Sequence, residues 1–290
     1  MLKPRSGSVP RQADDGNPQR RTYPTLVLTC AFFTAAATLP SGCVPLPQQR
    51  PIVPGPAPHS ARLGLWHIVH DRCIPGQIAS KEPTPCEALS IANGIEQGYA
   101  VLKDRVGIGQ YLLMPTILIT GIEDPRLLAA DAPNYFDDAW RIRQRVATRA
   151  RLSLQRDDIG IAVNSVYGRT QDLLHLRVDC LRTDVRDALR HAAPFLDRHW
   201  SRRTLTLAGH RYYAVRVDGD ETIATNPFQL LSSKLHVPAA DMGAWTIVMT
   251  GAYFPRQPGF ILLAARASLE SGDVASGEML QDHDCMGRVA

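Results

Sequence analysis

Alternation of apolar and polar positions predicts four strands in the middle of the chain. The segments 98–106 (GYAVLKDRV) and 110–115 (QYLLMP) are short and apolar, and glycines lie between them, which is the pattern of a β-hairpin. The segments 159–164 (IGIAVN) and 173–180 (LLHLRVDC) have the composition of two further strands. We therefore expect two strand pairs separated by about forty residues of other structure.

Helical periodicity predicts an amphipathic helix over 131–152. Apolar side chains recur at Tyr135, Ala139, Ile142 and Val146, at spacings of four, three and four. The arginines of this segment predict a basic surface, which is either simply solvated or in contact with anionic phospholipid headgroups. These arginines are Arg141, Arg143, Arg145, Arg149 and Arg151.

A second helix is expected to begin near Thr183. The hydroxyl of this residue is suited to cap it, Asp184 is favourable in the first turn, and the pattern continues through Leu189. Strands and helices in this order predict an α+β domain. No internal repeat is visible in the sequence.

The first 43 residues have the features of a targeting segment. Residues 25–39 contain no charge and directly follow Arg20 and Arg21, as in a signal peptide, and they are shorter than the roughly 20 residues of a comfortable membrane span. Two small residues precede Cys43, as in bacterial lipoprotein signals. Three interpretations stay open: a cleaved signal, an uncleaved membrane anchor, or a lipid-modified Cys43.

A proline-rich linker follows over 44–60, with six prolines in seventeen residues. The folded domain is therefore expected to comprise 61–290. With 44% hydrophobic and 21% charged residues in a chain of 290, it can bury one large core.

Charge excludes a nucleic-acid-binding role for this domain. The net charge is +4, but residues 1–43 hold five basic and two acidic side chains, so the domain itself is almost neutral. A protein that neutralises a run of phosphates needs a clear excess of basic side chains.

Four cysteines remain in the domain, and an even number in an exported protein suggests disulfides. Three pairings are possible. We favour Cys73 with Cys86, which closes a short proline-containing loop, and Cys180 with Cys285, which ties the carboxyl end to the domain.

A metal site is the competing interpretation of the first pair. His67, His70 and Cys73 recur every three residues, and Cys86 could complete a tetrahedral set. Ligands at this spacing drift around a helix, however, and the usual Cys-x-x-Cys half-site is missing, so we expect no metal.

Period two divides the segment 173–180 into an apolar face and a mixed face. The apolar face consists of Leu174, Leu176, Val178 and Cys180, and the mixed face consists of Leu173, His175, Arg177 and Asp179. On the mixed face, His175 and Arg177 are expected about 6 to 7 Å apart at Cα. A phosphate fits between an imidazole and a guanidinium at that spacing, which makes these two residues the catalytic candidates.

The connection before this strand offers hydrogen-bond donors for the same phosphate. A turn of this composition presents backbone N–H groups, a hydroxyl, amides and a second guanidinium. The candidate phosphate-binding residues are Asn164, Gly168, Arg169, Thr170 and Gln171.

These residues resemble those of the bacterial CDP-diacylglycerol pyrophosphatases, a family of the histidine-triad (HIT-like) superfamily of nucleotide hydrolases and transferases. The resemblance lies in 161–180 (IAVNSVYGRTQDLLHLRVDC), 101–104 (VLKD), 111–116 (YLLMPT) and 281–285 (QDHDC), and it spans about 73–285. It implies a HIT-like antiparallel sheet with flanking helices, preceded by an amino-terminal signal or anchor.

The superfamily signature is His-x-His-x-His, and only its middle histidine is present here, as His175. The first position is Leu173 and the third is Arg177. The resemblance implies that His175 attacks the α-phosphorus to form a nucleotidyl-histidine. Arginine binds an oxyanion but does not readily donate a proton. We expect the loss of the first histidine to weaken control of the His175 tautomer and to reduce activity.

The resemblance also implies which other residues meet the phosphate. These roles fall on Asn164, Thr170 and the backbone around Gly168, with Arg169 and Gln171 nearby. Lys103, His210 and His283 match residues of the family as well, but a structural hydrogen bond or a solvated charge is the favoured explanation of these three.

The implied function is hydrolysis of CDP-diacylglycerol to CMP and phosphatidate by a domain on the periplasmic side of the bacterial inner membrane, without metal or organic cofactor. Two alternatives remain: a related enzyme that acts on a soluble nucleotide, and a binding protein that has lost activity. The sequence contains no Gly-x-Ser-x-Gly elbow and no Walker motif, which disfavours serine-hydrolase and P-loop chemistry.

Overall fold

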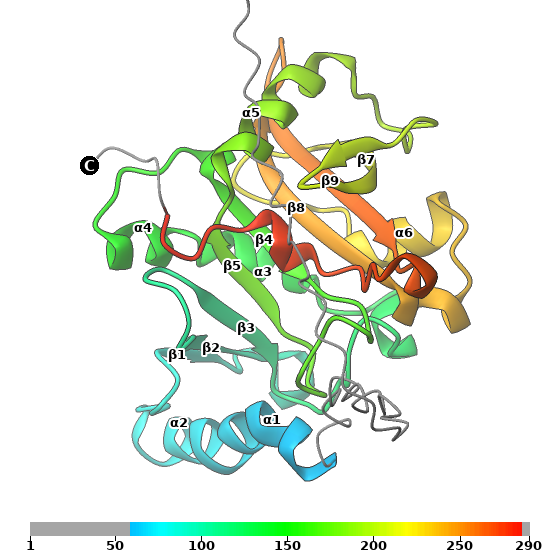
Figure 1. Ribbon diagram of the computed structural model, residues 1–290. Coiled ribbons are helices and arrows are strands. Elements are labelled where there is room, and N and C mark those ends of the chain that lie inside the picture. Colours follow the sequence, from blue (N-terminus) through cyan, green and yellow to red (C-terminus); the bar gives the residue numbers. More distant parts are fainter. Residues whose placement is uncertain (1–58, 286–290) are drawn as a thin grey trace, which may run out of the picture. The chain divides into compact units, whose positions relative to one another are not determined.

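The computed structural model describes residues 59–285, so the predictions for 1–43 and for nearly all of the linker 44–60 lie outside the described residues (Figure 1). Within the described range, every helix is too short or too polar to cross a membrane.

Six short helices and nine strands make up the described chain. The helices are α1 (Gly64–Ile68), α2 (Ile74–Ser80), α3 (Tyr135–Arg141), α4 (Gln144–Ala150), α5 (Thr183–Ala192) and α6 (Pro227–Lys234), and a π-helical turn, Val69–Cys73, joins α1 to α2. The strands are β1 (Ala88–Ser90), β2 (Tyr99–Lys103), β3 (Tyr111–Pro115), β4 (Ile159–Val163), β5 (Leu176–Cys180), β6 (Leu205–Leu207), β7 (His210–Asp218), β8 (Trp245–Tyr253) and β9 (Pro258–Arg266).

All nine strands belong to one antiparallel sheet, in the order β1-β2-β3-β5-β4-β8-β9-β7-β6. The predicted α+β class and both predicted strand pairs are confirmed, because β2 pairs with β3 and β4 pairs with β5. The nine-residue strands β8 and β9 form the other central pair.

The strand that contains the signature begins later than expected, at Leu176 instead of Leu173. The backbone N–H of Asp172 donates to the carbonyl of Arg62, and that of Leu174 donates to the carbonyl of Ile119. Because these N–H groups bind carbonyls outside the sheet, the chain joins the ladder only after His175.

The helix predicted over 131–152 is two helices, α3 and α4. Arg143 stacks on the ring of Trp140 at 4.2 Å and donates from Nη1 to the Trp140 carbonyl at 2.9 Å. A continuous helix would use that carbonyl for the N–H of Gln144, so the arginine ends the helix there.

Helix α5 begins at Thr183 as predicted, but Thr183 does not cap it. Arg182 occupies the cap position. Its side chain makes no capping hydrogen bond and instead pairs with Asp184 of the first turn at 2.8 Å.

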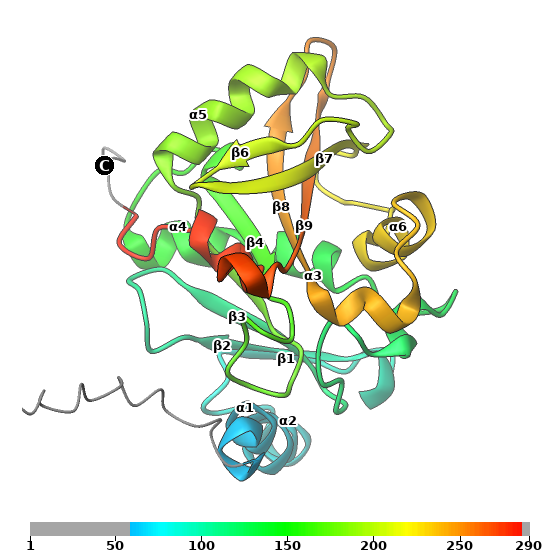
Figure 2. The same cartoon turned by 45° about the vertical axis from the view of Figure 1, so that its right-hand side comes forward.

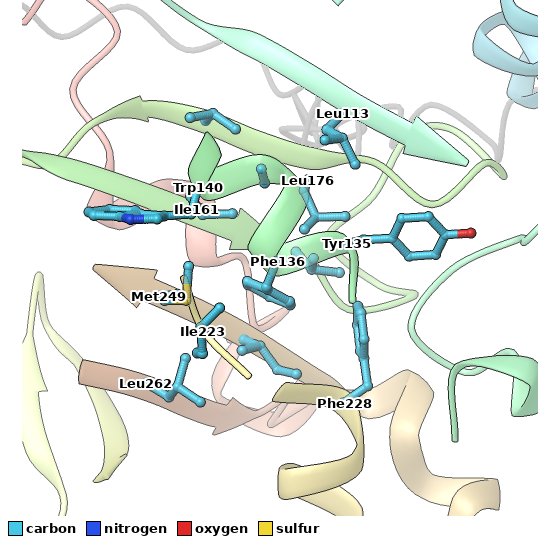
Figure 3. Packing of buried hydrophobic residues seen from close by; sticks show 14 of the residues in the cluster. Leu113, Tyr135, Phe136, Trp140, Ile161, Leu176, Ile223, Phe228, Met249 and Leu262 are labelled. Carbon is cyan, nitrogen blue, oxygen red and sulfur yellow. The ribbon is translucent and has the colours of Figure 1, made fainter. Parts of the chain in front are cut away.

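The main hydrophobic core lies on one face of the sheet, under α3, α4 and α6 (Figure 3). Tyr135, Phe136 and Trp140 of α3 and Phe228 of α6 are fully buried against strand residues such as Met249. Helix α5 covers part of the opposite face, and α1 and α2 cover another part.

The element order repeats once along the chain. The first half consists of helices α1 and α2, the hairpin β2–β3, helices α3 and α4, and the hairpin β4–β5, with the short strand β1 between α2 and β2. The second half consists of α5, the hairpin β6–β7, α6 and the hairpin β8–β9. The strand order of the second half mirrors that of the first, and the halves meet where β4 pairs with β8.

Both favoured disulfides are present, Cys73–Cys86 and Cys180–Cys285. The second holds residues 277–285, here named the C-terminal strap, across β4 and β5. Gln281 of the strap donates from Nε2 to the carbonyls of Gly160 and Arg177, at 2.7 and 2.9 Å. In Figure 1 the strap is the red segment in front of these strands.

Candidate active site

A cavity of about 730 Å³ separates the α1–α2 layer from the sheet and the C-terminal strap. The helical layer supplies Gly64 and Leu65 of α1 and Arg72 of the π-helical turn. The β2–β3 hairpin supplies Lys103 and Arg105, and the strap supplies Glu278. The signature region supplies Thr170, Gln171, His175 and Arg177. Four of the seven predicted site residues therefore share one cavity.

His175 lies immediately before β5, and its ring is fixed by the backbone. Nδ1 lies 2.7 Å from the carbonyl oxygen of Leu173. Because a carbonyl oxygen only accepts hydrogen bonds, Nδ1 carries the hydrogen and Nε2 keeps its lone pair. Nε2 has no hydrogen-bond partner among residues 59–285, so the lone pair is available for bonding.

His175 is also kept uncharged. Burial is the main cause that lowers its pKa to about 4, and the positive charge of Arg177 acts in the same direction. A neutral imidazole with a free Nε2 is the nucleophilic form of histidine. The residue as a whole is only 6% exposed, and it lines the cavity.

Leu173 takes part through its backbone. Its side chain is fully buried with Val69, Leu112 and Met114 in the apolar cluster under α1 and α2. Its carbonyl oxygen provides the orientation of the imidazole that we expected a first histidine to provide. The concern that Leu173 weakens tautomer control is therefore not supported by the geometry.

Arg177 is held by a chain of charges from the C-terminal strap. Its Nε lies 2.8 Å from Oε2 of Glu278, and Oε1 of Glu278 lies 3.5 Å from Nε2 of His283. Nδ1 of His283 binds the buried carboxylate of Asp179 at 2.7 Å. The guanidinium is therefore fixed beside His175.

The side chains of His283 and Glu278 in this row of charges stay ionised at neutral pH. Hydrogen bonds to Asp179 and then Glu278 raise the pKa of His283 to about 10. Burial alone would raise the pKa of Glu278, but the bond to His283 and the charge of Arg177 outweigh it and lower the pKa to about 2. Positive and negative charges therefore alternate from the His283 imidazolium through the Glu278 carboxylate to the Arg177 guanidinium, which lines the cavity.

Asn164 and Gly168 do not line the cavity, contrary to expectation. Asn164 donates from Nδ2 to the Gly168 carbonyl at 3.3 Å and to Glu278 at 3.2 Å, and its Oδ1 accepts from the backbone of Glu278. The Gly168 N–H donates to Ser165. Asn164 thus attaches the loop to the strap, and Gly168 binds within the loop, so both use their donors inside the protein.

Arg169 is buried and forms structural ion pairs. Its two Nη atoms bind both oxygens of Glu123 at 2.6 and 2.7 Å, and its Nε binds Asp172 at 3.2 Å. Since its charge is satisfied and it does not line the cavity, the phosphate role predicted for it lacks geometric support.

Thr170 and Gln171 do line the cavity. Thr170 is exposed there. The side chain of Gln171 accepts from the backbone N–H of Leu65 at 3.0 Å and donates to the carbonyl of Ala61 at 3.2 Å, so it joins the loop to the helical layer.

Of the three other residues matched to the family, Lys103 lines the cavity, and Nζ donates to the carbonyls of Asp104 and Gly107. His283 lies behind Glu278. His210 lies outside the cavity and pairs with Asp273 at 2.8 Å.

The metal interpretation of the first cysteine pair is wrong. Cys73 and Cys86 are disulfide-bonded, and His67 and His70 are exposed and both bind Asp71.

Sequence reasoning missed Glu278, Arg72 and Arg105. Glu278 is about one hundred residues from Arg177 in the chain, and no local pattern joins them. The signal that was available is the nearby QDHDC motif, which carries His283 and the disulfide that positions the strap.

Comparison with known proteins shows the family of the chain. The family model described as CDP-diacylglycerol pyrophosphatase matches residues 60–288. A CDP-diacylglycerol pyrophosphatase from Yersinia pestis is 41% identical over 222 residues, which cover 76% of this chain and 83% of that protein. The chain therefore belongs to the CDP-diacylglycerol pyrophosphatase family.

Proposed function

We propose that this protein hydrolyses the pyrophosphate bond of CDP-diacylglycerol, giving CMP and phosphatidate, through a covalent nucleotidyl-histidine on His175. The observation that carries the mechanism is the hydrogen bond from Nδ1 of His175 to the Leu173 carbonyl, which leaves Nε2 free in a cavity. The activity follows from membership of the family.

In the first step, the Nε2 lone pair bonds to the cytidylyl phosphorus and the bond from that phosphorus to the bridging oxygen breaks. Phosphatidate leaves with the bonding electrons. In the second step, water attacks the same phosphorus and the phosphorus–nitrogen bond breaks, with its electrons returning to Nε2. CMP departs, the proton lost by the water passes to solvent, and neutral His175 is restored.

Arg177 stabilises the negative charge that develops on the phosphoryl oxygens, and Thr170 donates from the cavity wall. Arginine cannot supply a proton to the leaving group. A phosphate leaving group departs far more easily than an alkoxide, so charge stabilisation suffices. Glu278 keeps the guanidinium in place.

The same proposal includes a HIT-like arrangement of the sheet and a location on the periplasmic side of the inner membrane. The antiparallel hairpins beside His175 and the two disulfides support these two points respectively.

The test is incubation of the purified full chain with CDP-diacylglycerol in detergent. We expect release of CMP by the wild-type chain and a loss of at least about 10³-fold in His175→Ala. His210→Ala, which removes a histidine outside the cavity, is the matched control and should retain activity.

Substrate labelled at the cytidylyl phosphorus separates the alternatives. A label on the protein that is released by acid and absent from His175→Ala supports the phosphoramidate. A preference for CDP-glycerol, which lacks the acyl chains, favours a soluble-nucleotide enzyme, and nucleotide binding without turnover favours a protein that has lost activity.

A further inference from the structure

The loop between β2 and β3 exposes two aliphatic side chains at the edge of the cavity. Val106 is 55% exposed and Ile108 is 46% exposed. The loop is well braced: the N–H of Val106 donates to the Asp104 carboxylate, and that of Ile108 donates to the carbonyl of His283 in the strap, at 2.9 Å. Solvent therefore meets apolar side chains that the backbone holds outward.

Three exposed arginines lie on this loop and on the end of α4 that packs near it. The loop packs against α4, because a Cβ on Gly109 would lie 3.0 Å from Val146. Arg105 of the loop and Arg149 and Arg151 at the end of α4 are exposed. Within residues 59–285, none of these three guanidiniums has a hydrogen bond or ion pair.

The acidic groups nearby do not cancel this charge. Asp104 and Asp284 lie in the loop and the adjoining strap, and Glu87 pairs with Arg145 in the groove of about 720 Å³ that Arg149 and Arg151 also line. In both Figure 1 and Figure 2, the β2–β3 loop, α4 and the end of the strap lie together on the left of the drawing.

This surface is continuous with the catalytic cavity, since Arg105 and Val106 line the same cavity as His175. We propose that the loop surface, comprising Arg105, Val106, Ile108, Arg149 and Arg151, docks on an anionic lipid bilayer. The aliphatic side chains enter the interface and the arginines bind lipid phosphates. The cavity mouth then faces the membrane, where the substrate of the proposed function lies.

Fluorescence in full-chain proteoliposomes tests docking without relying on activity. The vesicles contain phosphatidylcholine with about 30% phosphatidylglycerol, in plain and brominated forms. Tryptophan at position 108, in Ile108→Trp, should be quenched by brominated lipid at least about twofold more than tryptophan in Leu269→Trp. Leu269 is the matched control because it is 57% exposed in the turn after β9. Equal quenching would overturn the proposal.

Kinetics then tests the consequence. The rate on CDP-diacylglycerol in these vesicles, divided by the rate on CDP-glycerol in solution, should fall about tenfold in Ile108→Asp and in Arg149→Glu/Arg151→Glu. The ratio should not change in Leu269→Asp. A fall in Phe195→Asp instead, at an aromatic that is 87% exposed, would place docking elsewhere and overturn the proposal. If no variant or wild-type chain releases CMP, the proposed function fails, and quenching still decides docking.

Discussion

At the candidate site, a backbone group orients the imidazole of His175, where a side chain was expected to do so. The signature position before it is leucine, yet the Leu173 carbonyl sets which nitrogen of the imidazole is protonated. Such an effect cannot be predicted from side-chain identities, because every residue at position 173 has the same carbonyl. His175 and Arg177 could be predicted as neighbours from the sequence because their spacing is local, and both line the cavity.

The pH dependence of catalysis should report the environment of His175. Because burial and Arg177 lower its pKa to about 4, the ring stays neutral well below pH 6.5. We expect kcat/KM to fall on the acid side with a midpoint near 4, measured as CMP release across pH 3 to 8 in detergent. Arg177→Lys keeps the charge and should keep that midpoint, whereas Arg177→Met should move it upward. A wild-type midpoint near 6.5 would contradict the neutral, buried nucleophile.

Arg169 and Thr170 are neighbours in the chain that should differ in what their removal costs. Arg169→Ala leaves a bidentate partner, Glu123, without its cation, so we expect about 3 kcal/mol lower free energy of unfolding in urea titration. Thr170→Ala removes an exposed hydroxyl from the cavity, so kcat should fall about tenfold with unfolding unchanged. The reverse pattern would restore the phosphate role first predicted for Arg169.

At the scale of elements, periodicity predicted where strands and helices lie better than where they end. The apolar positions of 131–152 all face the core, but Arg143 ends α3 by binding its carbonyl, a tertiary detail with no periodic signal. The late start of β5 has the same origin, because Arg62 and Ile119 supply carbonyls from distant parts of the chain.

The C-terminal strap depends on one disulfide. Cys180→Ser/Cys285→Ser opens a loop closed across 105 residues, so we expect about 4 kcal/mol less stability in denaturant titration. Activity should also fall, since the strap carries Glu278. The comparison is Cys73→Ser/Cys86→Ser, which opens a separation of 13 residues and should cost about 2 kcal/mol less. Equal retention of CMP release in the first variant would mean that the strap holds Arg177 without the bond.

The order of the whole sheet could not be predicted from the sequence. Each hairpin is local, but the pairing of β4 with β8 joins segments more than eighty residues apart, and no residue pattern specifies that contact. The repeat of helices and hairpins is likewise invisible in the residues and plain in the topology.

One continuous sheet predicts one unfolding transition for residues 59–285. Trp66 and Trp140 lie in the first half, and Trp200 and Trp245 lie in the second. Urea midpoints from tryptophan fluorescence and from far-ultraviolet circular dichroism should therefore coincide. Two separated transitions would show that the halves unfold independently despite the pairing of β4 with β8.

The corresponding sheet faces of the two halves differ in polarity. In β9, the strand corresponding to β5, Ile261, Leu263 and Ala265 face α5 and are sealed in an apolar cluster where the first half has His175 and Arg177. Under the mechanism proposed above, the described repeat has its nucleophile in the first half and an apolar counterpart in the second. Each polypeptide should accept a single cytidylyl group, with the second half serving as scaffold for the first.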